Sequence, residues 1–428
     1  MHTPPAPLPP SQAGFHLMAK PSGPACNLDC TYCFYLEKEA LFGAPASRRM
    51  SPAVLEAYVR QTIAATPPDQ PVQFAWQGGE PTLLGIGFYA EALRLQRRYG
   101  EGRAIENAFQ TNGTLIDEDW ARFLADNRFL VGLSLDGPAR IHDHYRRYRS
   151  GAPSHHLVMA ALERLQRHDV AYNVLACVER HSARHPQAIY RFLKAQGVRF
   201  IQFTPIIERL AGPAYASAGF ALEGPAGAEG QGADDADISD DLASQMAPFA
   251  VRPRQWGRFL TTVFDEWRRK DVGEVFVMNF EWALAGLMGA PGVVCVHQRE
   301  CGRALIAEHN GDVYSCDHFA YPAYKLGNLT HDSLAALIDG ERQRAFGRAK
   351  HETLPDQCRA CPVLALCQGG CPKHRFATTR DGQPGLHYLC EGYLGYFTHI
   401  TPWLKTLAGL IASGQNPAQI KGLRAPRN

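Results

Sequence analysis

Short apolar segments alternate with amphipathic helical segments from residue 14 to about residue 280 of the 428-residue chain. This alternation constrains the fold strongly, because strands separated by helices connect through right-handed crossovers into a parallel sheet. Six such units are fewer than the eight of a closed barrel. We expect strands at 15–19, 72–76, 104–109, 130–135, 172–178 and 198–204, and helices near 52–65, 87–99, 117–126, 155–168, 186–196 and 255–270.

Polar and glycine-rich segments follow three of the predicted strands. The sequence QGGE at 77–80 follows the second strand, QTNG at 110–113 follows the third, and SLDGP at 134–138 closes the fourth. In folds of this kind, functional residues gather at the C-terminal ends of the parallel strands. We therefore expect the active site at that edge of the sheet.

Three cysteines, Cys26, Cys30 and Cys33, lie in the sequence CNLDCTYCFY after the first predicted strand. Three thiolates on one short loop can hold three irons of a four-iron cluster and leave the fourth iron free to bind a small molecule. A structural zinc site normally takes a fourth Cys or His nearby, and the residues that follow provide neither. The spacing therefore favours a catalytic iron-sulfur cluster over zinc.

The C-terminal part contains eight more cysteines, which is two full sets of four. Two protein-ligated four-iron clusters would use all of them, and a pair of zinc sites with four thiolates each is the alternative. The CxxxCxxC loop nearer the N-terminus favours iron. A further cysteine, Cys177, lies in an apolar strand and is expected to be an inert core residue. The eight are Cys295, Cys301, Cys316, Cys358, Cys361, Cys367, Cys371 and Cys390.

Charge and composition restrict the class of partner. The chain has 44 basic and 42 acidic residues and no long basic run, so nucleic acid is not an expected partner. No stretch reaches the ~18 to 20 apolar residues of a membrane helix, and MHTPPAPLPPSQ lacks a signal-peptide core, so no membrane partner is expected. Twelve cysteines in a chain too long for a disulfide scaffold fit a reducing cytoplasm.

CxxxCxxC with an aromatic residue before the third cysteine resembles the signature of radical S-adenosylmethionine (SAM) enzymes. The order of the C-terminal cysteines resembles the SPASM extension of peptide-modifying members. The segments CNLDCTYCFYLEKE, FAWQGGEPTL, FQTNGTLIDEDWARFL, FLVGLSLDGP, SCD and LCQGGC together resemble the anaerobic sulfatase-maturating enzymes, from about residue 15 to 400. The resemblance implies an α/β fold, an open partial (β/α)6 barrel with a C-terminal iron-sulfur SPASM domain.

The domain organisation implied by this resemblance has four parts. Residues 1–13 form a disordered N-terminus, 14–280 the radical SAM partial barrel, 281–400 the SPASM domain with its auxiliary clusters, and 401–428 a C-terminal helix and tail. Within the barrel, residues 211–250 are rich in Ala, Gly and Pro and carry an acidic patch. Such a composition buries too little apolar surface to offset ordering entropy, so we expect a flexible insertion there.

The family oxidises an active-site Cys or Ser of a sulfatase to formylglycine (3-oxoalanine) without oxygen. The resemblance therefore implies SAM and three 4Fe-4S clusters as cofactors. It also implies an unfolded sulfatase segment, Cys/Ser-x-Pro-x-Arg, as substrate and an electron donor such as flavodoxin or ferredoxin. Two alternatives are another SPASM peptide maturase, which forms thioether or carbon–carbon crosslinks, and a zinc-stabilised binding module.

The resemblance also assigns roles to individual residues. Asp317 matches the proposed general base, with a solvated turn residue as the alternative. Glu80 is expected near the SAM amino group or, alternatively, as a cap on the turn at Pro81, and the planar fork of Arg146 suits a carboxylate. The cofactor-binding set is Tyr32, Gly78, Gly79, Glu80, Ser134, Arg146 and Ile207, and the peptide-facing pair is Tyr35 and Gln77.

The cysteines are divided among three clusters in this assignment, and the histidine pairs are left out. Cys26, Cys30 and Cys33 hold the SAM cluster, Cys295, Cys301, Cys316 and Cys371 the first auxiliary cluster, and Cys358, Cys361, Cys367 and Cys390 the second. The pairs His142/His144 and His155/His156 lack the spacing of a metal site, so we expect surface histidines.

Overall fold

The computed structural model describes residues 11–35, 38, 41, 49–217, 221–225, 242–290 and 294–423. Its centre is a ten-stranded sheet in the order β10-β9-β8-β1-β2-β3-β4-β5-β6-β7. Strands β1 to β6 lie side by side in chain order, and each neighbouring pair among them is parallel. The predicted open α/β sheet is confirmed.

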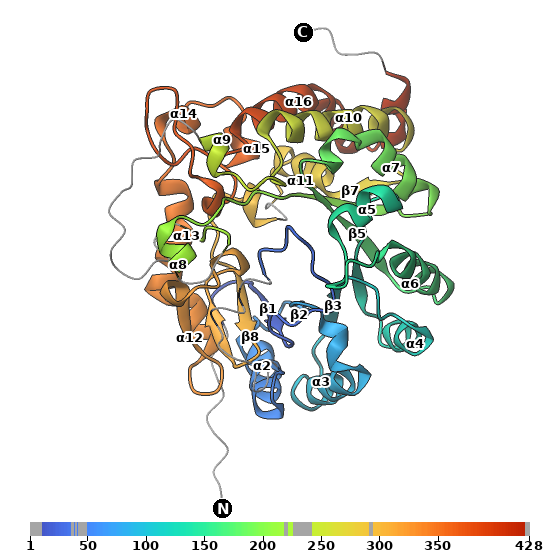
Figure 1. Ribbon diagram of the computed structural model, residues 1–428, viewed down its shortest axis with the longest axis vertical. Coiled ribbons are helices and arrows are strands. Elements are labelled where there is room, and N and C mark those ends of the chain that lie inside the picture. Colours follow the sequence, from blue (N-terminus) through green and yellow to red (C-terminus); the bar gives the residue numbers. More distant parts are fainter. Residues whose placement is uncertain are drawn as a thin grey trace, which may run out of the picture.

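The six expected strands and the helices that follow them closely match the predicted ranges. The strands are β1 His16–Lys20, β2 Val72–Trp76, β3 Ile105–Thr111, β4 Leu130–Ser134, β5 Tyr172–Val178 and β6 Phe200–Pro205. The helices are α2 Pro52–Ala65, α3 Ile86–Tyr99, α4 Glu118–Asp126, α6 His155–Arg167 and α7 Pro186–Ala195. These helices lie on the outer side of the curved sheet (Figure 1).

Caps and aromatic packing explain these elements locally. The Ser51 side chain accepts a hydrogen bond from the backbone N–H of Val54, which satisfies a free donor at the start of α2. Between the sheet and its outer helices, the rings of Trp76, Tyr89 and Phe109 meet edge to face at centroid distances of 5.6 and 5.0 Å. This arrangement is favourable for aromatic pairs and fills the core at the centre of the sheet.

Four strands were not predicted: β7 Phe276–Val277, β8 Ala304–Glu308, β9 Asp312–Tyr314 and β10 Lys325–Asn328. Strand β8 pairs in parallel with β1, so the cysteine-rich part continues the sheet of the barrel. Strands β8 and β9 are antiparallel and joined by a turn that contains Gly311, whose φ of 88° favours glycine.

The remaining helices cover the sheet ends and the cysteine-rich part. They are α5 Ala139–Tyr145, α8 Pro213–Ser217, α9 Leu242–Gln245, α10 Pro253–Lys270, α11 Met278–Leu287, α12 Leu334–Asp339, α13 Glu341–Glu352, α14 Asp356–Arg359, α15 Leu364–Cys367 and α16 Cys390–Ala412. Helices α10 and α16 lie side by side (Figure 1), because Gly257 and Gly392 let their backbones approach closely. The predicted boundary at residue 400 falls inside α16.

Two predicted flexible segments are more ordered than expected where the structure describes them. Ser11 is buried, and its backbone N–H donates to the carbonyl of Ala65. At the end of the 211–250 insertion, Met246 forms a bridge with Arg209, and Phe249 is buried. The rest of the predicted N-terminal disorder, residues 1–10, and residues 218–220 and 226–241 of the insertion lie outside the described residues.

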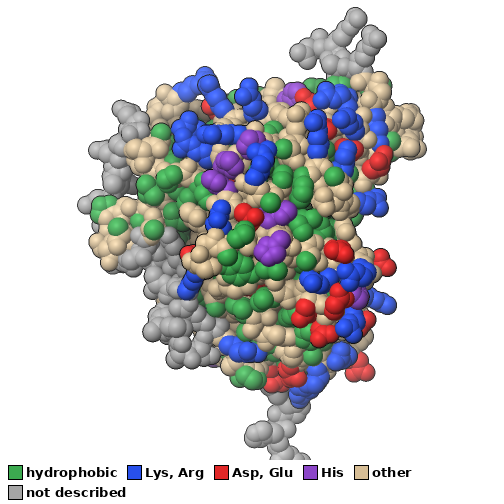
Figure 2. Space-filling model, turned by 45° about the vertical axis from the view of Figure 1, so that its right-hand side comes forward, with side chains coloured by type: hydrophobic (Ala, Val, Ile, Leu, Met, Phe, Trp, Pro, Cys, Tyr) green, Lys and Arg blue, Asp and Glu red, His purple; other side chains and the backbone are tan. Residues whose placement is uncertain are grey.

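The surface carries charges of both signs. On the face shown in Figure 2, basic and acidic side chains are interspersed with hydrophobic ones, and histidines gather among basic residues in the upper half. In the part of the chain that the structure describes, no helix is both long and apolar enough to cross a membrane.

Candidate active site

The loop after β1 carries the three cysteines of the CxxxCxxC motif. The Sγ of Cys26 accepts hydrogen bonds from the backbone N–H of Leu28 at 3.4 Å and from Nδ2 of Asn112 at 3.8 Å. Burial raises the pKa of Cys26 to about 12, and the nearby thiol of Cys33 adds to the rise. Burial also raises the pKa of Cys30, to which Cys33 and Cys26 again contribute. The three thiols thus influence one another's pKa, as neighbours on one short loop do.

The eight C-terminal cysteines separate into two groups of four by the same criterion. Burial raises the pKa of Cys316, with contributions from Cys371 and Cys295, and it raises the pKa of Cys371 to about 12, with contributions from Cys295 and Cys301. The second group is Cys358, Cys361, Cys367 and Cys390: burial raises the pKa of Cys390 to about 11, and Cys358 and Cys361 add to the rise. The division of these cysteines between two auxiliary clusters stays a prediction.

The chemistry of these donors fits iron-sulfur clusters. One loop provides three partly exposed sulfurs, of which that of Cys26 accepts N–H donors, and the C-terminal part provides eight more, which suits one open and two closed four-iron clusters. Within the described residues, no three His, Cys, Asp or Glu side chains are placed to hold a single metal ion.

The QGGE segment after β2 packs against the cysteine loop through its backbone. The N–H of Gly79 donates to the carbonyl of Gly23 at 2.8 Å, and the N–H of Glu80 donates to the carbonyl of Ala25 at 2.8 Å. A Cβ on Gly79 would lie 2.1 Å from the carbonyl oxygen of Ala25, and one on Gly78 would lie 3.1 Å from that of Gly23. Glycine at 79 is thus required by close approach to the loop.

Glu80 is a structural residue in this arrangement. Its carboxylate is fully buried and accepts hydrogen bonds from Thr82 N–H at 3.0 Å, Thr111 Oγ1 at 2.8 Å and Asn112 N–H at 2.7 Å. Burial raises the pKa of Glu80, although these hydrogen bonds oppose the rise. The carboxylate therefore caps the turn at Pro81, as the alternative interpretation expected, and its contact with SAM stays a prediction.

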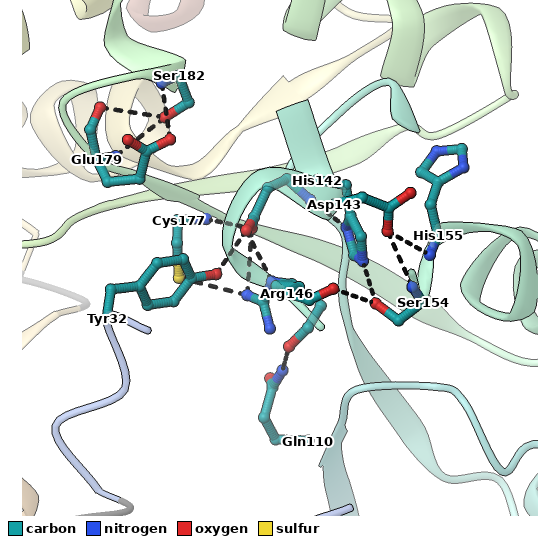
Figure 3. A network of polar contacts seen from close by, with 12 residues as sticks. Tyr32, Gln110, His142, Asp143, Arg146, Ser154, His155, Cys177, Glu179 and Ser182 are labelled. Atoms are coloured by element: carbon teal, nitrogen blue, oxygen red, sulfur yellow. Dashed lines mark hydrogen bonds and ion pairs between the residues drawn. The ribbon is translucent and has the colours of Figure 1, made fainter. Parts of the chain in front are cut away.

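A buried polar network links the cysteine loop to β4 and β5 (Figure 3). Its hub is Asp136, which accepts hydrogen bonds from Tyr32 Oη at 2.5 Å, Arg146 Nε at 2.7 Å and the Cys177 N–H at 2.8 Å. Burial would raise the pKa of Asp136, but the Arg146 guanidinium outweighs it and the pKa is lowered. The fork of Arg146 thus pairs with the carboxylate of Asp136, and its contact with SAM stays a prediction.

The same network contains two residues singled out in the sequence. The partly exposed side chain of Cys177 packs against the core, and its Sγ accepts a hydrogen bond from Arg146 Nη2 at 3.4 Å. His142 is fully buried, and its Nε2 lies 3.1 Å from Ser154 Oγ, so the prediction of a surface histidine was wrong.

The other predicted cofactor residues lie at neighbouring strand ends. Ser134, at the end of β4, accepts a hydrogen bond from Gln110 Nε2 at 3.1 Å. Ile207 follows β6 and is buried. It lines a cavity of about 150 Å³ together with Phe34, His318 and Cys371, so the end of β6 meets the cysteine-rich part at this cavity.

Asp317 follows Cys316 directly and forms an ion pair with Lys20 at the end of β1. The distance from Lys20 Nζ to Asp317 Oδ1 is 2.8 Å. Burial acts to raise the pKa of Asp317, but the charge and hydrogen bond of Lys20 outweigh it and the pKa is lowered. The carboxylate is thus held charged and is not the fully solvated turn residue of the alternative interpretation.

The two predicted peptide-facing residues flank this ion pair. The backbone N–H of Gln77 donates to the carbonyl of Ala19 at 3.0 Å, next to Lys20. Tyr35 is buried, and its hydroxyl donates to Glu308, so this hydroxyl is turned away from open space.

Sequence reasoning missed three charged residues of the site. Lys20 and Glu308 are paired across β1 and β8, and Asp136 lies in the SLDGP segment. All three are buried, whereas charged side chains are normally exposed. The position of Asp136 at a strand end was a usable signal, but the pairing of β1 with β8 had none.

Comparison with known proteins agrees with this geometry. Residues 21–193 match the model of the radical SAM superfamily, and residues 295–362 match that of an iron-sulfur cluster-binding domain. A serine-type anaerobic sulfatase-maturating enzyme of Bacteroides thetaiotaomicron is 41% identical over 95% of this chain and 94% of its own. A cysteine-type enzyme of Clostridium perfringens is 30% identical over 92% of this chain and 98% of its own.

A solved structure described as native anSMEcpe with bound AdoMet and Cp18Cys peptide superposes with a TM-score of 0.78. It is 30% identical and covers 93% of this chain and all of its own. Sequence and structure agree over nearly the whole length. The chain therefore belongs to the anaerobic sulfatase-maturating enzymes of the radical SAM superfamily.

Proposed function

We propose that this protein oxidises a serine or cysteine in an unfolded sulfatase segment to formylglycine, with SAM and three 4Fe-4S clusters as cofactors. One observation carries the proposal: three cysteines lie on the loop after β1 and eight in the C-terminal part, and Asp317, the residue after Cys316, forms a partly exposed ion pair with Lys20 at the end of β1. This combination suits an open cluster, two closed clusters and a base at one site.

The cysteines would hold the three clusters in the predicted sets. Cys26, Cys30 and Cys33 would hold the cluster with the open iron, and the two groups of four would hold the auxiliary clusters. When bound, the open cluster and SAM supply the radical that removes a hydrogen atom from the β-carbon of the target residue. The chain's own contribution is to fix the loop, exclude water and accept a proton.

The Asp136 network would keep the cysteine loop in place. Tyr32 lies between two of the three cysteines, and its hydroxyl is tied to Asp136. Asp136 is tied in turn to Arg146 and to the backbone of β5. Because these groups are buried, the loop is fixed against β4 and β5 rather than left in solvent.

Asp317 would accept the proton from the target hydroxyl or thiol as the side chain is oxidised. Its lowered pKa keeps the carboxylate ionised before the reaction, as a proton acceptor requires. Gln77, Tyr35 and the backbone around Gly78 would border the peptide on the side of β2.

The preferred target residue and the partners are finer parts of the proposal. Serine-type relatives are 41% and 36% identical and the cysteine-type relative is 30% identical, which favours serine peptides. A reduced flavodoxin or ferredoxin would supply electrons. Eleven of the twelve cysteines would serve as thiolate ligands, which supports a reducing compartment such as the cytoplasm.

The test is to reconstitute the protein anaerobically and supply SAM, a reductant and matched Ser-x-Pro-x-Arg and Cys-x-Pro-x-Arg peptides. We expect about 12 irons per chain and an aldehyde that reacts with hydrazine, formed faster on the serine peptide. A crosslinked peptide without aldehyde would instead identify another SPASM maturase. Zinc without labile sulfide would identify a zinc-stabilised binding module.

A further inference from the structure

Lys20 is a buried lysine whose ammonium lies directly beside the proposed base. Its Nζ is 2.8 Å from Asp317 Oδ1, and the side chain of Lys20 is 1% exposed while that of Asp317 is 22% exposed. The cation is therefore enclosed and the carboxylate reaches open space. Oδ1 of Asp317 is itself buried, so the exposed part of this side chain lies away from the contact with Lys20.

A second contact fixes the ammonium group. Its Nζ lies 4.5 Å from the centroid of the Tyr35 ring, a favourable cation–π distance. The Tyr35 hydroxyl is itself tied to Glu308, which lies opposite Lys20 on the paired strand β8 and is fully buried. Lys20 is thus held between Tyr35 and Asp317, and the Asp317 carboxylate is held by Lys20.

Stability alone does not account for this lysine. Enclosing an ammonium group removes it from water, and apolar residues of similar volume often stabilise a fold as well as a buried ion pair does. The neighbours of Lys20 point to a role in the reaction instead. The backbone N–H of Gln77 donates to Ala19, the residue before Lys20. The Tyr35 ring contacts the Lys20 ammonium group, and Asp317 pairs with it. Gln77 and Tyr35 are the predicted peptide-facing residues, and Asp317 is the proposed base.

We infer that Lys20 is a positioning residue for the oxidation: it fixes Oδ1 of Asp317 and leaves Oδ2 directed at the proton of the target hydroxyl or thiol. This inference rests on the proposed function, in which Asp317 is the base. Misplacement of a reacting group by about 1 Å can cost about 10²-fold in rate, so loss of the ammonium group should be visible in turnover.

The test compares Lys20→Met, Asp317→Asn and the double variant in the reconstituted enzyme with SAM and the serine peptide. We expect Asp317→Asn to lower aldehyde formation by ~10² to 10⁴, and Lys20→Met by ~10 to 10². In both, iron content and 5′-deoxyadenosine formation should persist, so the ratio of 5′-deoxyadenosine to aldehyde rises. The double variant should be no slower than Asp317→Asn, because Lys20 acts through Asp317.

Two further variants separate positioning from general damage. Lys20→Arg keeps the positive charge and should recover part of the lost aldehyde yield, with a peptide KM within about twofold of the wild type. The matched control is Lys194→Met, because Lys194 Nζ also lies 2.8 Å from an aspartate, Asp271, but on α7. This control should leave the product ratio unchanged.

The base role of Asp317 and the positioning role of Lys20 are refuted by different outcomes. Normal aldehyde yield in Asp317→Asn would refute the proposed base. A lowered aldehyde yield in Asp317→Asn with a normal yield in Lys20→Met would overturn only the positioning role of Lys20. The same conclusion would follow if the fold-losses of the two single variants multiplied in the double variant. If Lys20→Met fails to load iron, Lys20→Gln, which retains a donor, is judged by the same product ratio.

Discussion

Replacing Asp136 with alanine should destabilise the protein strongly, because Asp136 is the hub of the buried network that joins Tyr32, Arg146 and Cys177. Its carboxylate accepts hydrogen bonds from Tyr32, from Nε and Nη2 of Arg146, and from the Cys177 backbone. Arg146 is 7% exposed and would keep its charge without a partner. Removing one partner of a buried ion pair costs about 3 to 5 kcal/mol of unfolding free energy.

Urea unfolding of the reconstituted protein measures this loss. With a denaturant slope of about 3 kcal/mol/M or more for a chain of this size, the midpoint should fall by about 1 M. The control is Asp119→Ala, whose ion pair with Arg122 is exposed and should contribute less than about 1 kcal/mol. A loss for Asp136→Ala as small as that of the control would refute the role assigned to the network.

A second measurement tests the same reasoning through the coupling of the two residues. Arg146→Met should also destabilise the protein, because it leaves the Asp136 carboxylate buried without its cation. The double variant should lose less than the sum of the two single variants, since neither charge then remains unpaired. Strictly additive losses would mean that the two side chains do not act as a pair.

Three other perturbations have defined outcomes. Gly79→Ala places a Cβ 2.1 Å from the Ala25 carbonyl oxygen and should cost about 1 to 3 kcal/mol and lower SAM cleavage, whereas Gly87→Ala, with no atom within 4 Å, should do neither. Replacing the three cysteines of the β1 loop with alanine should reduce iron from about 12 to about 8 per chain and abolish SAM cleavage. The hydrogen bond from His399 to Asp265 raises the pKa of His399. The protonated histidine therefore stabilises the fold below about pH 6.5, and this contribution is lost as pH rises through the pKa of His399 in the folded protein. His399→Gln should lower the unfolding free energy by about 0.5 kcal/mol near pH 6 and leave it unchanged near pH 9.

The sequence predicted the elements that carry strong local signals. Strands at 72–76 and 172–178 and the helix at 52–65 match β2, β5 and α2 to the residue. The helix boundary was readable because Ser51 and Pro52 form a standard helix start. Strands β7 and β9 have two and three residues, too few for a periodic pattern, although Asn310-Gly311 was a usable hairpin signal before β9.

Cysteine spacing within one segment predicts cluster ligands, and the family of the chain was predictable from it. The buried charges of the site were not predictable. The ion pair of Lys20 with Asp317 depends on the pairing of β1 with β8, which brings together residues far apart in the chain. No local pattern indicates such a partner. The same holds for the pairing of Arg146 with Asp136.

Hydrogen transfer from the target residue tests the central claim most directly. A Ser-x-Pro-x-Arg peptide with deuterium on the β-carbon of its serine would be incubated with the reconstituted protein, SAM and a reductant, and the 5′-deoxyadenosine would be analysed by mass spectrometry. We predict deuterium in the 5′-deoxyadenosine together with loss of deuterium from the aldehyde product. Aldehyde formation with no deuterium in the 5′-deoxyadenosine would contradict direct oxidation of the side chain at this site.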